Sequence, residues 1–394
     1  MTFPNDEAAT SMLDQDIASA MQGWRHDLHA HPETAFTERR TSDVVAARLA
    51  EDGYEVHRGL AETGVVGTLR NGDGPAIGLR ADMDALFIEE KGSVPHVSRH
   101  PGKMHACGHD GHTTMLLGAA RQLARSRNFR GTLHVIFQPA EENEGGGRRM
   151  IADGLFERFP CSEVYGLHNW PALPLGRFAI NRATMMAAFD TFEIVVTGHG
   201  CHGAMPEAGI DPLVPAAQIL LALQTIVSRR LSPMDQAVVS VTQVHGGDTW
   251  NVIPDSAVLR GTARSMSPRV QDEIEARMRE LVRSIAEAHG AVAHLTYERR
   301  YPATINAPAA ADKAARAARA VVGDDRVVTD CQPSMASEDF GFMLERLPGA
   351  YIFMGVADEL HRASLHNPLY DFNDSALEIG AAFWVKLVEQ VLPA

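Results

Sequence analysis

The chain has 394 residues, a formal net charge of −14 at pH 7 and a hydrophobic content of 45%. This length exceeds one ordinary domain and predicts two or three. A nucleic-acid surface needs a basic patch, so the acidic balance argues against nucleic acid as a partner. The sequence holds no apolar run long enough to span a membrane, so no membrane partner is expected.

The N-terminus and the cysteines both favour a cytoplasmic location. The opening residues MTFPNDE carry acidic side chains where a secretory signal needs basic ones, and no apolar stretch follows. The cysteines have no framework spacing, so disulfides are not expected. They are Cys107, Cys161, Cys201 and Cys331.

The first predicted element is an amphipathic helix over residues 13–28, which leads into His26, His29 and His31. These histidines look like ligands, but Pro32 ends the helix there, and a solvated helix end is the favoured interpretation. A second helix is predicted over 41–51. Short strands follow at 54–57, 65–69 and 76–80.

Acidic residues follow the third of these strands. Asp82 and Asp84 stand two apart in an extended segment, so both carboxylates can face one side. The carboxyl ends of strands are where open α/β sheets place their ligands. A turn or helix-cap role is the alternative for each.

The segment MHACGHDGHT, residues 104–113, places one thiol and three imidazoles within eight residues. Thiolate and imidazole together suit zinc and its transition-metal neighbours. The apolar residues that follow predict a helix with Asp110 as its N-cap, which leaves Cys107 and His109 in the turn before it. Ordinary loop histidines beside a buried cysteine are the alternative interpretation.

Two more predicted strands end in residues that could bind a metal. A buried strand over 131–138 is followed by the adjacent carboxylates Glu141 and Glu142, which repel each other unless a cation is near; a solvated acidic loop is the alternative. A strand over 163–167 is followed by His168. Strands interspersed with helices predict a doubly wound α/β domain with a mixed sheet.

The pattern changes over residues 184–300, where strands and helices follow the order β-α-β-β-α-β of a ferredoxin-like α+β fold. We therefore expect an inserted domain at 184–300 between two parts of the α/β domain, at 1–183 and 301–394. The last part is predicted to contain helices over 309–322 and 375–392, with Asp374 capping the second.

Eight segments stand in an order that resembles a known family. They are RADMDAL, MHACGHDGHT, FQPAEE, GLHNWP, GCHGAMP, TWNVIPD, SEDF and HNPLYDFND. The chain is similar to the metal-dependent amidohydrolases that include hippurate hydrolases and indole-acetyl-amino-acid hydrolases. Aminoacylases and acetylornithine deacetylases are more distant relatives. The resemblance implies a catalytic domain with two divalent metal ions (Mn²⁺, Zn²⁺, Co²⁺ or Ni²⁺) and an inserted domain for dimerisation and substrate closure. It also implies a homodimer or homotetramer.

The resemblance also assigns roles to individual residues. The implied metal ligands are Cys107, His109, Glu142, His168 and His366. The implied general base is Glu141, and His202 resembles a histidine that stabilises the oxyanion, often in the partner subunit's site. Asn251 and Arg264 resemble substrate contacts. Asp84 or Asp82 resembles the aspartate that orients a ligand, and this choice stays open.

Three functions are weighed on these residues. The leading one is a dinuclear metal hydrolase that cleaves the amide bond of N-acyl amino acids. A thiol hydrolase with Cys107 as nucleophile is the second, but it leaves the paired Glu141 and Glu142 without a role. A metal- or ligand-binding protein without turnover is the third. The acyl group, the amino acid and the metal stay open.

Overall fold

The computed structural model describes residues 13–142 and 144–394, which form two compact units. The first comprises the described residues up to Met185 with Ile305–Gln332 and Phe342–Ala394. The second comprises Met186–Thr304 and Pro333–Gly341. No pattern in the sequence indicated that Pro333–Gly341 would join the second unit.

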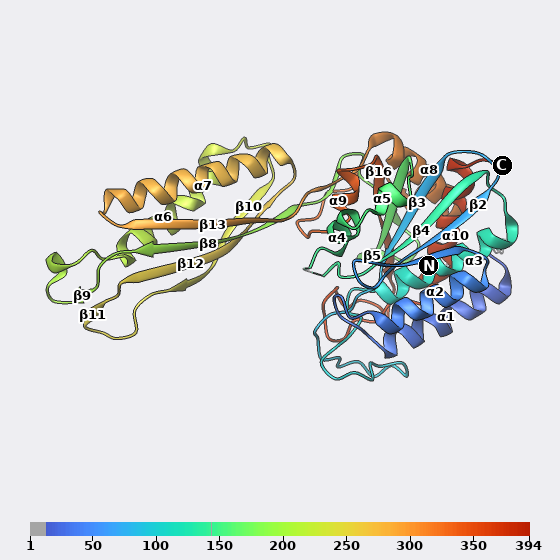
Figure 1. Cartoon of the computed structure of the whole chain (residues 1–394), viewed down its shortest axis with the longest axis horizontal. Coiled ribbons are helices and arrows are strands. Elements are labelled where there is room, and N and C mark those ends of the chain that lie inside the picture. The colour runs from blue at the N-terminus through green and yellow to red at the C-terminus, as the bar shows by residue number, and fades with distance from the viewer. Residues whose placement is uncertain (1–12, 143) are drawn as a thin grey trace, which may run out of the picture. The chain divides into compact units, whose positions relative to one another are not determined.

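The first unit is built on one mixed eight-stranded sheet, which confirms the predicted α/β class (Figure 1). Its centre is parallel, because β3 pairs with β4 and β5, and β5 pairs with β16, all in parallel. From edge to edge the strands are β1 (Glu55–Leu60), β2 (Gly64–Asn71), β4 (Gly131–Gln138), β3 (Ala76–Asp82), β5 (Glu163–Pro174), β16 (Gly349–Ala357), β6 (Phe178–Ala179) and β15 (Val327–Val328).

The helices of this unit bury apolar faces against the sheet. The longer ones are α1 (Gln15–Ala30), α2 (Arg39–Glu51), α3 (His109–Ser126), α8 (Pro308–Val322) and α10 (Ser375–Val391). The shorter ones are α4 (Gly146–Ala152), α5 (Leu155–Arg158) and α9 (Gly341–Leu344). The short strands β7 (Thr184–Met186) and β14 (Thr304–Ile305) pair where the chain passes between the two units.

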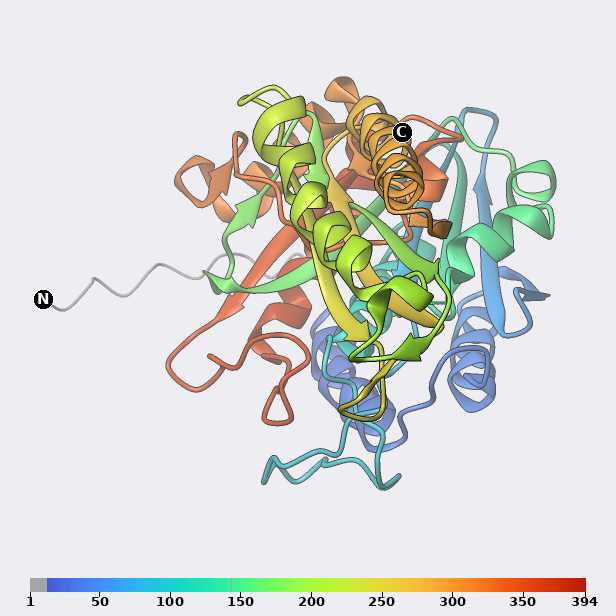
Figure 2. The ribbon, with the colours of Figure 1, turned by 90° about the vertical axis from the view of Figure 1, so that its left-hand side faces the viewer.

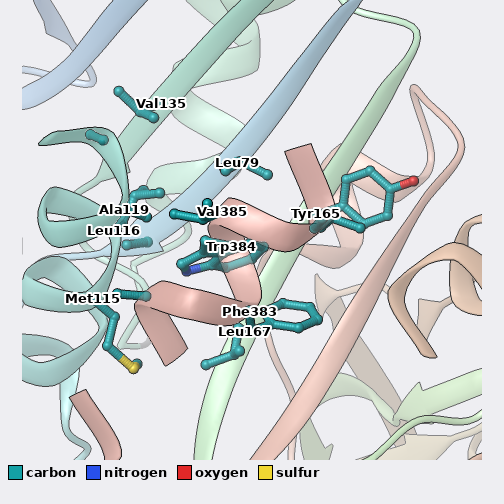
Figure 3. Packing of buried hydrophobic residues seen from close by; sticks show 14 of the residues in the cluster. Leu79, Met115, Leu116, Ala119, Val135, Tyr165, Leu167, Phe383, Trp384 and Val385 are labelled. Atoms are coloured by element: carbon teal, nitrogen blue, oxygen red, sulfur yellow. The ribbon is translucent and has the colours of Figure 1, made fainter. Parts of the chain in front are cut away.

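The core that supports the site lies between α3, α10 and the central strands. Met115 and Leu116 of α3 pack beside Phe383 and Trp384 of α10, and apolar side chains of β3, β4 and β5 line the same core (Figure 3). All four of these side chains are at most 2% exposed. Burying a large apolar side chain contributes about 1.5–3 kcal/mol. This packing therefore holds α3, which carries His109, firmly against the sheet.

Two predictions in the N-terminal half are wrong. The helix after the MHACGHDGHT segment begins at His109, with Gly108 as N-cap, so Asp110 lies inside its first turn. His29 is not at a solvated helix end: it is fully buried, and its Nδ1 lies 2.8 Å from the Asp110 carboxylate. The two errors are linked, because Asp110 points to α1 instead of capping α3.

The second unit has the predicted ferredoxin-like arrangement. Its antiparallel sheet runs β10 (Ala237–His245), β12 (Ser256–Ser265), β8 (Ala188–Thr197) and β13 (Val292–Tyr301). Figure 2 shows α6 (Leu213–Thr225) and α7 (Pro268–Ala288) together on one face of this sheet. The two-residue strands β9 (Cys201–His202) and β11 (Val252–Ile253) form a separate ribbon.

In the part of the chain that the structure describes, no helix is both long and apolar enough to cross a membrane.

Candidate metal centre

The site lies where the central parallel strands end. β3 ends at Asp82 with Asp84 just beyond it, β4 is followed by Glu141 and Glu142, and β5 carries His168. Because β4, β3 and β5 are neighbours and run in parallel, their carboxyl ends meet at one edge of the sheet. The fold therefore brings together residues that are far apart in the sequence.

Two groups of possible metal ligands share the thiol of Cys107. One contains Cys107, His109 and His168, and the other contains Cys107, Glu142 and His366, with the ligand atoms of each group within 4.8 Å of one another. All five residues that the resemblance names as ligands are in these two groups. A thiolate between two three-ligand groups is an arrangement that could hold two cations.

His109 is oriented by Asp84. The His109 Nδ1–H donates to the Asp84 carbonyl oxygen at 2.9 Å, and Asp84 Oδ1 lies 3.3 Å from the same nitrogen. This leaves Nε2 facing the cluster, and among the described residues it has no hydrogen-bond partner although the side chain is fully buried. A buried imidazole nitrogen without a partner is what a metal ion would satisfy.

Charge also favours a cation at this position. Burial alone would lower the pKa of His109, but the charge of Asp82, the hydrogen bond and charge of Asp84 and the charge of Glu142 raise it to about 10. The surrounding carboxylates therefore favour a positive charge where His109 faces the cluster. A divalent metal ion would supply that charge in place of the proton.

His168 is held as a neutral imidazole. Its Nδ1–H donates to the Asn169 carbonyl oxygen at 2.6 Å, which turns Nε2 toward the Cys107 sulfur at 3.4 Å. Burial, with the charges of His112 and His109, holds the pKa of His168 well below its usual range. Neutral imidazole is the form that binds metal.

Asp82 supports the site from a second layer. Its carboxylate forms an ion pair with Arg80 at 2.7 Å and accepts a hydrogen bond from His112 Nδ1 at 2.6 Å. Burial would raise the pKa of Asp82, but the charges of His109, Arg80 and His112 hold it well below its usual range. Its nearest oxygen lies 3.7 Å from His109, so Asp84 makes the closer contact with that ligand.

The environment of Cys107 fits a metal thiolate and not a free nucleophile. Burial raises the pKa of the Cys107 thiol well above its ordinary value, and the charges of Glu142, Glu141 and Asp82 raise it further. A nucleophilic cysteine needs a lowered pKa. A bound metal removes the thiol proton outright, so the donor set fits metal binding and disfavours the thiol-hydrolase alternative.

In the second ligand group, His366 is positioned by an unusual backbone conformation. His366 has a φ of 62°, rare for a residue with a Cβ, and its N–H donates to the Ala106 carbonyl at 2.8 Å. Its Nε2 lies 3.0 Å from Glu142 Oε1. The His366 side chain is 52% exposed, so this end of the cluster is open to solvent.

Glu141 lies beside the cluster without belonging to the two groups that share Cys107. Its carboxylate comes within 4.8 Å of ligand atoms of His109 and Glu142. The residue itself is only 6% exposed. Glu141 and Glu142 lie in the turn after β4, and only Glu142 is in a group with Cys107, so one glutamate can hold a metal while the other faces water.

The remaining predicted residues belong to the second unit. His202 is exposed on the β9–β11 ribbon, where it pairs with Val252, and the Gly203 N–H donates to the Asn251 carbonyl at 2.7 Å. Arg264 is half-buried over the ring of Phe189 at 4.0 Å and donates to Ser337. The structure therefore places His202 and Asn251 together but leaves Arg264 apart from them.

Arg264 and His202 lie toward opposite ends of the second unit. Arg264 is near the end of β12, eight residues beyond its first residue, Ser256, while the ribbon precedes β12. At a rise of about 3.3 Å per residue this stretch of strand alone spans about 26 Å. A small substrate cannot reach both side chains of one subunit.

Several supporting residues were not identified from the sequence. Gly108, with a φ of 92°, is required because a Cβ there would lie 2.5 Å from the Asn169 amide oxygen. Asn169 in turn donates to the Tyr370 hydroxyl at 2.7 Å. Glu38 is fully buried and accepts the Ala140 N–H at 3.0 Å, next to Glu141. The only sequence signal for Asn169 and Gly108 was their position inside the motifs, and Glu38 had none.

Comparison with known proteins identifies the family. The model of peptidase family M20/M25/M40 matches residues 78–390, which is most of the chain. The chain belongs to this family. It is therefore a metal-dependent amidohydrolase or peptidase of the M20 type, as the sequence resemblance predicted.

Individual M20 proteins match over almost the whole length. The chain is 40% identical to a hippurate hydrolase of Campylobacter jejuni over 378 residues, covering 96% of this chain and 98% of that protein. It is 37% identical to an N-acetyl-L-cysteine deacetylase of Bacillus subtilis, covering 94% and 88%. The crystal structure of the Bacillus subtilis YXEP protein, described as a dinuclear metal binding peptidase, superposes with a TM-score of 0.85 at 33% identity, covering 96% and 99%.

Proposed function

We propose that this protein is a dinuclear metal hydrolase that cleaves the amide bond of N-acyl amino acids. The observation that carries the proposal is the pair of ligand groups sharing Cys107, with Glu141 beside them. The Campylobacter relative is a hippurate hydrolase and the Bacillus relative is an N-acetyl-L-cysteine deacetylase, so their substrates share an acylated amino acid. Hippurate-like conjugates are within this class.

The proposed roles follow from what amide hydrolysis requires. Two bound cations would bring the pKa of a water to about 7 and polarise the substrate carbonyl. Glu141 takes the proton from that water and delivers it to the leaving nitrogen. Asp84 keeps His109 oriented as a ligand through the contacts at Nδ1. Asp82 acts behind it by holding His112.

The second unit supplies groups for the substrate. His202 donates a hydrogen bond to the developing oxyanion, a contribution of about 3 kcal/mol to the barrier. Asn251, next to it on the ribbon, contacts the substrate amide. Arg264 binds the free carboxylate of the amino acid, which needs a local cation in a protein with a net charge of −14.

The types of ligand restrict the choice of metal to a group of several divalent ions. Thiolate with imidazole and carboxylate suits borderline divalent ions, and we propose Mn²⁺, Zn²⁺, Co²⁺ or Ni²⁺. All four cysteines are free thiols. This fits the reducing cytoplasm, which we keep as the proposed location.

We also propose that the protein works as a homodimer, or as a homotetramer built from such dimers. The strand β10 is an edge of the four-stranded sheet, and Val244 on it is 56% exposed. On α6, Val214 is 46% and Leu221 is 68% exposed. An unpaired edge beside exposed apolar side chains favours pairing with a second copy. A dimer would also let His202 and Arg264 of different subunits meet one substrate.

A turnover screen tests the proposal. The protein is treated with chelator, and benzoylglycine, N-acetyl-L-cysteine and other N-acyl amino acids are assayed before and after re-addition of each divalent metal. Hydrolysis should disappear with the chelator and return with metal. Hydrolysis that is indifferent to chelator, together with an acyl group trapped on Cys107, would refute the metal mechanism.

A further inference from the structure

The turn that carries Glu141 has a backbone conformation that needs support. Ala140, the preceding residue, has a φ of 56°, in the left-handed region that residues with a Cβ avoid. Its carbonyl oxygen accepts the Gly146 N–H at 2.9 Å. Such a conformation persists only where the surroundings impose it, and it commonly marks a functional site.

Two buried carboxylates hold this turn, one on each side of Glu141. Glu38 Oε1 accepts the Ala140 N–H at 3.0 Å, and Asp84 Oδ2 accepts the Glu142 N–H at 2.9 Å. Both carboxylates belong to residues that are at most 1% exposed. The backbone amides that flank Glu141 are therefore both fixed, from two different parts of the chain.

Glu38 is itself held in place at both oxygens. Its Oε1 also accepts the Phe36 N–H at 3.1 Å, and its Oε2 accepts the Thr63 hydroxyl at 2.7 Å. Among the described residues, Glu38 is in none of the groups of possible metal ligands. Its side chain makes its hydrogen bond to the site through the backbone of Ala140, and it lies close enough to Asp84 to sense the charge of that carboxylate.

We propose that Glu38 is a positioning residue for the general base: by accepting the Ala140 N–H it imposes the left-handed turn that aims the Glu141 carboxylate. The inference rests on the proposed role of Glu141. The start of α2 would then contribute to catalysis, although α2 carries none of the candidate metal ligands.

The alternative is that Glu38 only stabilises the fold, and a double-mutant cycle separates the two. Glu38→Ala removes the acceptor and should lower kcat about a hundredfold, because a displacement of about 1 Å at a catalytic group has effects of that size. Metal content and KM should change little. In the Glu141→Gln background the same substitution should change the residual rate less than about threefold, since the group it positions is already lost.

Two variants serve as controls. Glu38→Gln keeps a carbonyl oxygen for the Ala140 N–H and can donate to the Thr63 hydroxyl, so it should stay within about threefold of the original kcat. Glu33→Ala removes a carboxylate that accepts the Arg40 and Thr41 N–H groups but does not contact the turn. It should lower stability and leave kcat unchanged.

The outcomes distinguish the inference from the proposed function. The inference alone would be overturned if Glu38→Ala lowered kcat by the same factor in the original protein and in the Glu141→Gln variant. It would also be overturned if Glu38→Gln lowered kcat as much as Glu38→Ala does. Full turnover in Glu141→Gln would overturn the proposed function and the inference with it. If Glu38→Ala does not fold, Thr63→Val takes its place, because it loosens the same carboxylate. Thr63→Val should lower kcat about threefold to tenfold. This decrease should again be absent in the Glu141→Gln background.

Discussion

A pair of glycine-to-alanine substitutions tests how closely the ligand-bearing segments are packed. A Cβ at Gly111 in α3 would lie 2.4, 2.5 and 2.6 Å from three ring atoms of Phe372, which is fully buried. Overpacking of a core costs about 1–3 kcal/mol, and contacts this short place the cost near the upper end. Alanine in a helix regains about 1 kcal/mol over glycine. The expected net loss for Gly111→Ala is therefore about 2 kcal/mol.

The matched control is Gly23→Ala in α1. The added Cβ would meet nothing within 4 Å, so only the helix preference of alanine over glycine remains. The free energy of unfolding is therefore expected to rise by about 1 kcal/mol. In thermal unfolding the first variant should melt about 4–8 °C below the original protein. Because Phe372 follows His366 by six residues, Gly111→Ala should also weaken metal binding in a chelator competition. Equal stability of the two variants would refute the packing argument.

Three further predictions concern the second unit and pH. His202→Ala should keep folding and metal content but lower kcat about a hundredfold, and mixing it with inactive Glu141→Gln subunits should restore activity if His202 acts in the partner subunit's site. No recovery despite heterodimers detected by mass spectrometry would place it in its own subunit's site or outside catalysis. Arg264→Met should raise KM at least about tenfold for N-acyl amino acids, as loss of a charged hydrogen bond does, and leave KM unchanged for the matching amides without a carboxylate. Burial would lower the pKa of His29, but the charge of Asp110 and the hydrogen bond to it raise it to about 9. Stability from this contact is complete below pH 6.5 and lost as pH rises through about 9, so urea unfolding should show a decline in this window that His29→Asn lacks.

The candidate metal ligands could be proposed from the sequence because they lie in a few short motifs. Glu142 and His168 stand in motifs that follow or end clear strands, which a parallel sheet places at one edge, whereas Cys107 and His109 stand where α3 begins. A few motifs therefore indicated both the fold class and the candidate ligands.

The supporting contacts were not predictable, since they depend on partners distant in the sequence. His29 appeared solvated because Pro32 ends its helix, yet Asp110, 81 residues away, buries it. Asp110 in turn has the residue type and place of an N-cap, but α3 begins one residue earlier at His109. In both cases the ion pair between His29 and Asp110, which forms only in the tertiary fold, overrides the conformation that the local sequence favours.

Glu38 shows the same limit at the catalytic turn. In the sequence, Glu38 is a single acidic residue that precedes a helix. The usual role expected of such a residue is to stabilise the N-terminus of that helix. Its burial and its bond to Ala140, 102 residues away, exist only in the folded chain.

The adjacent glutamates offer the most direct test of a metal cluster with a separate general base. Metal content by mass spectrometry and hydrolysis rate are measured together for Glu141→Gln and Glu142→Ala. Glu141→Gln should retain two metal ions per chain with kcat lowered about a hundredfold or more, because only the proton transfer is removed. Glu142→Ala should lose metal, because a ligand is removed. Equal depletion of metal in both variants, or full turnover in Glu141→Gln, would contradict the account.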